Sequence, residues 1–225
     1  MSIGSIVRTV LGPRGFRVVG RLYREVFVDL GEVARAVATA IPDGVHILDV
    51  GGGDGEPLNY LLDRLQASTV TMIDLSPAIG GFLEEKHRSR VEIRGGMSLR
   101  QYVDGIFVGG PHRRPDVLLV SDVMHHIPAD GRAAFYHEIG RLFDRCPNLT
   151  VIIKDLEPGH WRTTLGRFCD RYITGDRNVR MISRGELVTG ITQSLGALDS
   201  FETFLHQEDA PNYALVFRKH QLAGQ

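Results

Sequence analysis

Two adjacent histidines and a later aspartate are the residues of this chain best suited to acid–base chemistry. His125 and His126 come shortly after the apolar run 116–120, and Asp155 follows a second apolar run at 150–153. Imidazole titrates near neutral pH, so it can accept the proton of a hydroxyl group that becomes a nucleophile. A neighbouring carboxylate would fix the tautomer of that imidazole and raise its basicity. The pattern predicts a general base, with one histidine facing a substrate and the other packed beneath the turn.

The same segments leave a divalent metal open as an alternative to the histidine base. Asp122 and Asp155 follow two apolar runs, and Glu157 lies two positions further along the chain. Carboxylate oxygens are ligands that a magnesium ion accepts in proteins. Asp155 could also serve as a turn or helix-capping residue. We favour the histidine base and assign no metal ligands.

A glycine-rich turn forms the second functional pattern. Gly51, Gly53 and Gly55 follow an apolar run at 45–50, and Pro57 precedes leucines at helical spacing. Glycines let a ligand approach the backbone closely, and the start of a helix presents N–H groups that lack intrahelical partners. A proline is well tolerated in the first helical turn. This succession of strand, turn and helix predicts a nucleotide-binding crevice.

The acids around this turn indicate a cationic nucleotide rather than a dinucleotide. Asp49 ends the strand and Asp54 lies in the turn, where both would repel a pyrophosphate and attract an amine or a sulfonium. Glu56 stands where a dinucleotide-binding fold needs its third glycine, which disfavours an NAD-dependent oxidoreductase. Asp74 ends the next apolar run, at the place where a carboxylate can hold both ribose hydroxyls. Leu75 would then lie against the adenine.

These motifs resemble those of class I S-adenosylmethionine (SAM) methyltransferases. The resemblance rests on the turn 49–55, on Asp74, on the segment 121–127 and on the fifth strand, and it covers roughly residues 40–218. It implies SAM as the cofactor and S-adenosylhomocysteine as the product. Nucleic-acid N-methyltransferases of this class usually carry a Pro-Pro-aromatic turn after the fourth strand, which this chain lacks.

The resemblance also implies which residues bind the cofactor. Members of the class often place an aspartate after the third strand to meet the adenine amino group, but this chain has Gly96 and Met97 there. Backbone groups and Met97 would then hold the adenine. The implied cofactor-binding residues are Asp49, Gly51, Gly53, Asp54, Asp74, Leu75, Gly96, Met97, Ser121 and Asp122.

The resemblance implies an α/β fold with a Rossmann-like, seven-stranded, mostly parallel sheet, helices on both faces and an antiparallel last strand. We expect residues 1–40 to form a helical leader or cap and residues 41–225 to form the methyltransferase domain, with a lid insertion at about 158–185. Strands are expected at 45–50, 70–73, 91–94, 116–120, 150–153, 200–206 and 213–217, and helices at 16–40, after Pro57, from Ser76-Pro77, at 132–143 and at 183–195.

Composition narrows the class of partner. The chain has 225 residues, 43% of them hydrophobic and 24% charged, as in an ordinary globular domain. Its net charge of −1 argues against an obligate nucleic-acid binder. No apolar run approaches a membrane span, so we expect no membrane partner. The two cysteines, Cys146 and Cys169, lack zinc-type spacing and indicate a reducing compartment, the cytoplasm.

The function that we expect is methyl transfer from SAM to a hydroxyl of a small molecule. The pair His125-His126 followed by Asp155 resembles small-molecule O-methyltransferases, including those acting on sugars and glycosides. The chain also resembles short actinobacterial methyltransferases, among them mycobacterial enzymes acting on methylmannosides, so a sugar or glycoside is favoured. A magnesium-dependent O-methyltransferase using Asp122 and Asp155, and a non-catalytic SAM-binding protein, are the alternatives. A homodimer formed through the leader helix stays open.

Overall fold

The structure is a computed structural model that describes residues 30–110, 112–146, 148–159, 179–195, 200–206 and 211–218. Most of the predicted leader at 1–40 and most of the predicted lid at 158–185 lie outside these residues. From the leader, the structure describes helix α2 (Leu30–Thr39). None of the helices within the described ranges combines the length and the apolar character that crossing a bilayer requires.

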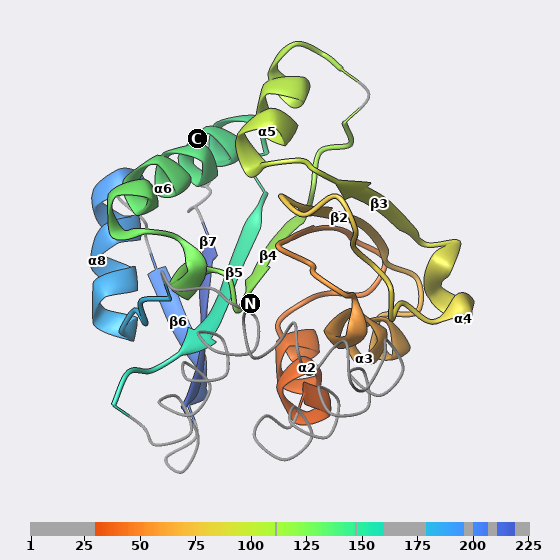
Figure 1. The fold of residues 1–225 in the computed structure, drawn as a ribbon, viewed down its shortest axis with the longest axis horizontal. Helices are drawn as coiled ribbons and strands as arrows, with labels where there is room; N and C mark the ends of the chain where they lie inside the picture. Colours follow the sequence, from red (N-terminus) through yellow and green to blue (C-terminus); the bar gives the residue numbers. More distant parts are fainter. Residues whose placement is uncertain are drawn as a thin grey trace, which may run out of the picture.

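One sheet organises the chain (Figure 1). Its strands are β1 (His46–Val50), β2 (Thr69–Asp74), β3 (Val91–Gly95), β4 (Val117–Ser121), β5 (Thr150–Leu156), β6 (Ser200–His206) and β7 (Asn212–Arg218). The seven strands lie in the order β3-β2-β1-β4-β5-β7-β6. Strands β1 to β5 pair in parallel, whereas β7 is antiparallel to both β5 and β6. The predicted class, an α/β fold with a mostly parallel sheet and an antiparallel last strand, is confirmed.

Helices cover both faces of this sheet. Besides α2 they are α3 (Glu56–Arg64), α4 (Glu85–Arg88), α5 (Leu99–Phe107), α6 (Ala129–Arg145) and α8 (Arg184–Leu195), with a short 3-10 helix, η1 (Met124–His126). Successive residues of a strand point to opposite faces. Accordingly Leu48 of β1 joins the core cluster formed with α5, α6 and α8, while Ile47 joins the cluster formed with α2 and α3.

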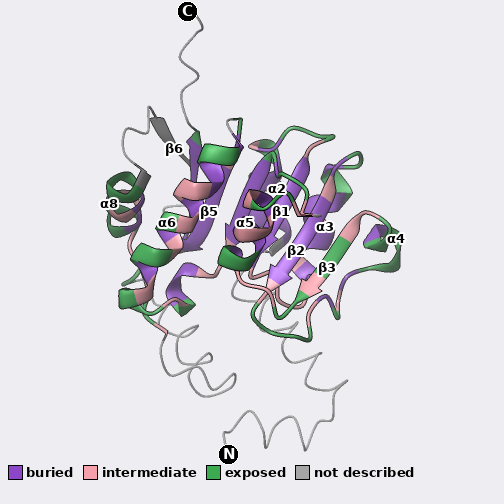
Figure 2. Cartoon of the chain, turned by 90° about the horizontal axis from the view of Figure 1, so that it is seen from above, coloured by how far each residue is buried: buried purple, intermediate pink, exposed green. Residues whose placement is uncertain are grey.

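The central strands are buried on both faces, which explains why they read as continuous apolar runs. Every residue of β1 is buried, and β4 and β5 are buried along nearly all their length. Strand β3 is different because it lies at the edge of the sheet, and Glu92, Ile93 and Gly95 are exposed. Figure 2 shows the contrast between the purple central strands and the partly green β3.

The segment after β2 departs from the prediction. Ser76-Pro77 was expected to begin a helix, but the chain stays non-helical there and the next helix, α4, begins at Glu85. The physical reason is that backbone N–H groups of this segment bond to the glycine turn. The N–H of Gly80 donates to the carbonyl of Gly53 at 2.9 Å, and the N–H of Phe82 donates to that of Asp54 at 2.8 Å.

Strand β5 is longer than predicted because β7 pairs with it as far as Leu156. Asp155, expected to follow the strand, therefore lies within it, opposite Tyr213. Helix α8 begins at Arg184, one residue after the predicted start, because Ser183 caps it: the Ser183 hydroxyl accepts the N–H of Glu186 at 3.2 Å. In return the Glu186 carboxylate accepts the N–H of Ser183 at 3.0 Å, which completes a capping box.

We expect the central strands to contribute far more to stability than the edge. Ile152 of β5 is fully buried, whereas Ile93 of β3 is 38% exposed. Ile152→Ala should lower the free energy of unfolding by about 2–5 kcal/mol, because it removes transfer free energy and leaves a cavity. The matched variant Ile93→Ala should cost about 1 kcal/mol or less. Urea unfolding of both variants measures the difference, and equal losses would contradict this account of the core.

Candidate active site

The glycine turn between β1 and α3 is held tightly against its neighbours. Gly51, Gly53 and Gly55 all have positive φ angles, of 75°, 53° and 82°. A Cβ atom at Gly51 would lie 2.3 Å from a methyl carbon of Val123, two residues before His125. The N–H of Gly51 donates to the carbonyl of Ile73 at 2.8 Å. The turn therefore needs glycine at its first position, and it adjoins the segment after β4 that carries the histidines.

Asp74 fastens this turn to the end of β2. One carboxylate oxygen accepts the N–H of Gly53 at 3.1 Å, and the other accepts the N–H of Ser76 at 2.8 Å. The carbonyl of Asp74 accepts the N–H of Met97 at 2.9 Å, and Gly96 is also brought to this edge by its bond to the Ser76 carbonyl. Leu75 beside them is 76% exposed, which is unusual for a large apolar side chain. These predicted cofactor residues lie together at one edge of the sheet.

Asp49 is a buried carboxyl group directly before the turn. It is 6% exposed, and a Cβ atom at Gly52 would lie 2.7 Å from its Oδ2. Burial, together with the negative charge of Asp74, raises the pKa of Asp49 to about 7. A cation bound in this turn would favour the ionised form of Asp49, because it would offset both effects.

The structure joins His125 to Asp155, as the sequence predicts. The Nδ1 of His125 lies 2.7 Å from one carboxylate oxygen of Asp155, and the His125 backbone N–H donates to the other at 3.2 Å. Asp155 is fully buried and His125 is 4% exposed. Because an ionised carboxylate only accepts hydrogen bonds, Nδ1 carries the proton in this contact and Nε2 becomes the accepting nitrogen.

The two predicted histidines occupy different environments. His125 is buried, whereas His126 is exposed. Their ring centroids are 4.1 Å apart, with the planes tilted by 43°. One histidine is therefore buried and the other exposed, and which of them faces a substrate stays a prediction. The carboxylate contact, however, belongs to the buried histidine.

Asp122 forms an ion pair that the sequence analysis did not predict. The Nζ of Lys154 lies 2.6 and 2.7 Å from the two carboxylate oxygens of Asp122, and the lysine side chain is only 1% exposed. Burial by itself raises the pKa of Asp122, but the charges of Lys154 and His125 and the hydrogen bonds to the carboxylate hold it below its ordinary value. Ser121 adds a bond of 3.4 Å to the same carboxylate. The sequence feature that could have predicted this ion pair is the position of Lys154, directly after the apolar run at 150–153.

A buried arginine supports the histidine turn. Arg132 donates from Nε to the carbonyl of Ile127 at 3.1 Å and from Nη2 to the carbonyl of Arg180 at 2.6 Å. Arg180 in turn donates its backbone N–H to the carbonyl of His125 at 2.9 Å. The sequence gives no signal for the contacts with Arg180, because they join segments that are far apart along the chain.

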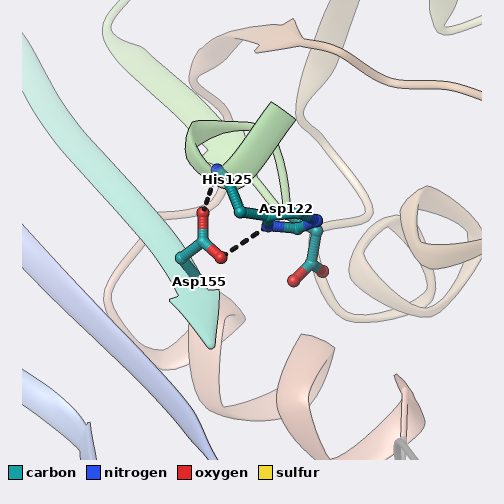
Figure 3. Close-up of side chains that lie close together, drawn as sticks. All are labelled: Asp122, His125 and Asp155. Atoms are coloured by element: carbon teal, nitrogen blue, oxygen red, sulfur yellow. Dashed lines mark hydrogen bonds and ion pairs between the residues drawn. The ribbon is translucent and has the colours of Figure 1, made fainter. Parts of the chain in front are cut away.

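The side chains that could bind a metal ion fit the predicted magnesium site only in part. Asp122, His125 and Asp155 each offer a ligand atom, and these atoms lie within 4.8 Å of one another (Figure 3). The Lys154 ammonium, however, already contacts both oxygens of Asp122. Glu157 accepts the backbone N–H of Arg184 at 3.0 Å and is not a member of the cluster. The arrangement suits an internal ion pair better than a divalent ion.

Comparisons with known proteins show the fold. No family model and no curated protein matches the chain. The crystal structure of human N-acetylserotonin methyltransferase in complex with SAM matches with a TM-score of 0.60 and 17% identity, covering 88% of this chain and 56% of that chain. The structure of a mitomycin 7-O-methyltransferase matches with a TM-score of 0.62 and 18% identity, covering 95% and 60%. This chain therefore spans less than two thirds of either protein.

A third solved structure is closer to this chain in length. It is a TehB-like SAM-dependent methyltransferase from Corynebacterium glutamicum, with a TM-score of 0.52 and 19% identity, covering 84% of this chain and 88% of that chain. At these identities the likeness establishes the Rossmann-like fold, and the function of this chain has to be argued from its own residues.

The raised pKa of Asp49 predicts a dependence of stability on pH. An unfolded aspartate ionises near pH 4, whereas folded Asp49 ionises near pH 7. Between these values the folded state binds more protons than the unfolded state, so stability falls as pH rises. Between pH 5 and pH 8 the stability of Asp49→Asn, measured by thermal unfolding, should fall less than the stability of the unmodified protein. Asp54→Asn is the matched control, and identical pH dependence in all three proteins would contradict the prediction.

Proposed function

We propose that this protein transfers a methyl group from SAM to a hydroxyl of a small molecule. The observation that carries the proposal is the buried pair of His125 and Asp155, joined at 2.7 Å beside the glycine turn. Ligands of open α/β sheets bind at the carboxyl ends of the strands, and both features lie there. An imidazole oriented by a buried carboxylate suits proton removal from an alcohol.

The cofactor assignment is supported by the turn and its acids. The positive φ angles of the glycines bring the backbone to the surface of the crevice without side chains, and Asp74 is fixed at the tip of β2, where it can meet ribose hydroxyls. Asp54, together with Asp49 once a bound cation favours its ionised form, makes this end of the site negative, which suits a sulfonium and an ammonium group. One of the solved structures with this fold was determined in complex with SAM.

The proposed mechanism depends on positioning and on one proton transfer. SAM, when bound, supplies an electrophilic methyl group on its sulfonium. Asp155 holds the Nδ1–H tautomer of His125, so Nε2 has a lone pair for the hydroxyl proton. That proton passes to Nε2 as the acceptor oxygen gains the methyl group, and S-adenosylhomocysteine leaves. Holding the two reactants in line supplies much of the rate.

A sugar or glycoside is the acceptor that we favour. An alcohol is a poor nucleophile while it keeps its proton, so it needs the base more than a phenol or a carboxylate does. The oriented His125 therefore supports an alcoholic hydroxyl, which sugars offer in number. We also infer a reducing, cytoplasmic setting, because Cys146 is a buried free thiol and no zinc-type spacing is present.

Two alternatives make different predictions. Magnesium-dependent transfer would need Asp122 as a ligand, and the contact of its carboxylate with Lys154 weighs against that. A non-catalytic SAM-binding protein would bind the cofactor without turnover. Calorimetric titration with S-adenosylhomocysteine, with NAD as the control, tests the class. Methyl transfer to hydroxylated acceptors is then measured with and without chelator. Transfer that chelator does not affect supports the histidine base, transfer that chelator abolishes supports magnesium, and no transfer supports a non-catalytic protein.

Asp74 should be essential for cofactor affinity. Asp74→Ala should weaken binding of S-adenosylhomocysteine by about tenfold or more. The substitution removes a hydrogen-bond partner of the ribose and the bond to the Gly53 N–H. The loss of one charged hydrogen bond costs roughly 1.5–3 kcal/mol. Calorimetric titration measures the change. Asp63→Ala, at a half-exposed position on α3, is the matched control. Unchanged affinity of the Asp74 variant would refute the ribose assignment.

His125 should be essential for turnover and not for cofactor binding. His125→Ala should lower the rate of methyl transfer by roughly 10²–10⁴-fold, the usual contribution of a general base, while affinity for S-adenosylhomocysteine stays nearly constant. His126→Ala is the matched control, and Asp155→Asn should resemble the His125 variant. If activity is lost in the His126 variant alone, the base is His126 and the proposed role of the buried pair is wrong.

A further inference from the structure

Lys154 is a buried charged residue of the candidate active site that the proposed proton transfer does not use. Its side chain is 1% exposed, and it contacts Asp122 at two points. The ammonium lies 2.6 and 2.7 Å from the carboxylate oxygens, and the Lys154 carbonyl accepts the Asp122 backbone N–H at 2.9 Å. Lys154 thus fixes both the side chain and the backbone of Asp122.

Asp122 needs such support because its backbone is unfavourable. Its φ of 58° is in the left-handed region, and it is the only non-glycine residue with a positive φ within the described ranges. Aspartate tolerates this region better than most residues with a Cβ atom, but the conformation still costs free energy that surrounding contacts can offset. The side chain is 36% exposed, so the carboxylate contacts the buried lysine and is also partly accessible to solvent.

The surroundings of Asp122 are those of a cation site. Asp122, His125 and Asp155 present ligand atoms within 4.8 Å of one another from β5 and from the segment after β4. Two carboxylates in a largely buried place require a compensating positive charge. Asp155 is satisfied by hydrogen bonds, from His125 at 2.7 Å and from the Leu156 N–H at 2.8 Å. For Asp122 the compensating charge is the ammonium of Lys154.

We propose that Lys154 is the resident cation of this site, where its ammonium occupies the place at Asp122 that a divalent metal would otherwise take. The unmodified protein therefore excludes divalent metals from Asp122, His125 and Asp155. Replacement of Lys154 by a neutral side chain of similar shape opens a divalent-metal site there. This role makes Lys154 a positioning residue, and in the proposed methyl transfer, on which this part rests, it makes the reaction independent of metal.

The physical basis is competition for the same two oxygens. A divalent ion bonds carboxylate oxygens at roughly 2.0–2.6 Å, so at Asp122 it would lie within a few ångströms of the ammonium and be repelled. Loss of the ammonium leaves the carboxylate without its compensating charge, beside an imidazole and a second carboxylate. Mixed carboxylate and imidazole ligands suit manganese, which also gives a direct spectroscopic signal.

The test is titration with Mn²⁺, followed by the loss of the electron paramagnetic resonance signal of the free ion. Four proteins are compared: unmodified, Lys154→Met, Lys154→Arg, and Lys154→Met combined with Asp122→Asn. Lys154→Met should bind one Mn²⁺ at least about tenfold more tightly than the unmodified protein. Lys154→Arg keeps the positive charge and should not gain this binding, and the double variant should lose it. Circular dichroism confirms folding.

Two results would overturn the proposal. One is Mn²⁺ binding by the unmodified protein that Asp122→Asn abolishes, a comparison that does not require the Lys154 variant to fold. The other is a folded Lys154→Met variant that binds Mn²⁺ no more tightly than the unmodified protein. Because the titration uses neither SAM nor an acceptor, its outcome is separate from the calorimetric test of the methyltransferase function.

Discussion

The parallel pairing of β4 with β5 is the constraint on which the candidate site depends. It sets Ser121 opposite Lys154, so the residues that follow β4 meet the last residues of β5. Side chains alternate along a strand, and Lys154 and Asp155 therefore leave β5 on opposite faces of the sheet. One strand end thereby supplies a cation to Asp122 and an anion to His125.

Charge compensation in a buried setting explains why these pairs are so close. An isolated buried charge is costly, and a partner at hydrogen-bond distance offsets that cost. Asp155 is fully buried and Lys154 nearly so, and each has a partner within 2.7 Å. The Lys154–Asp122 ion pair and the His125–Asp155 hydrogen bond are adjacent, since Asp122 and His125 belong to the same short segment. A change at one pair should therefore be felt electrostatically at the other.

The proposed cofactor site is built differently, because there backbone N–H groups are bonded to one carboxylate, that of Asp74. Asp74 accepts N–H groups from Gly53 and Ser76, and the segment after β2 bonds to the glycine turn through Gly80. The bond from Gly80 uses an N–H group that, in a helix starting at Ser76, would have bonded to the Ser76 carbonyl. These bonds fix the shape of the glycine turn, and the segment after β2 is therefore not helical.

The sequence by itself determined the elements that local patterns specify: the apolar central strands, the glycine turn before α3, and the helix at 183–195. It also placed His125 and Asp155 in one site, because parallel strands end at a common edge. Only the tertiary structure decided that His125 is buried while His126 is exposed, that Lys154 pairs with Asp122, and that Asp49 has a raised pKa. These features depend on burial and on contacts between distant segments, which no local pattern encodes.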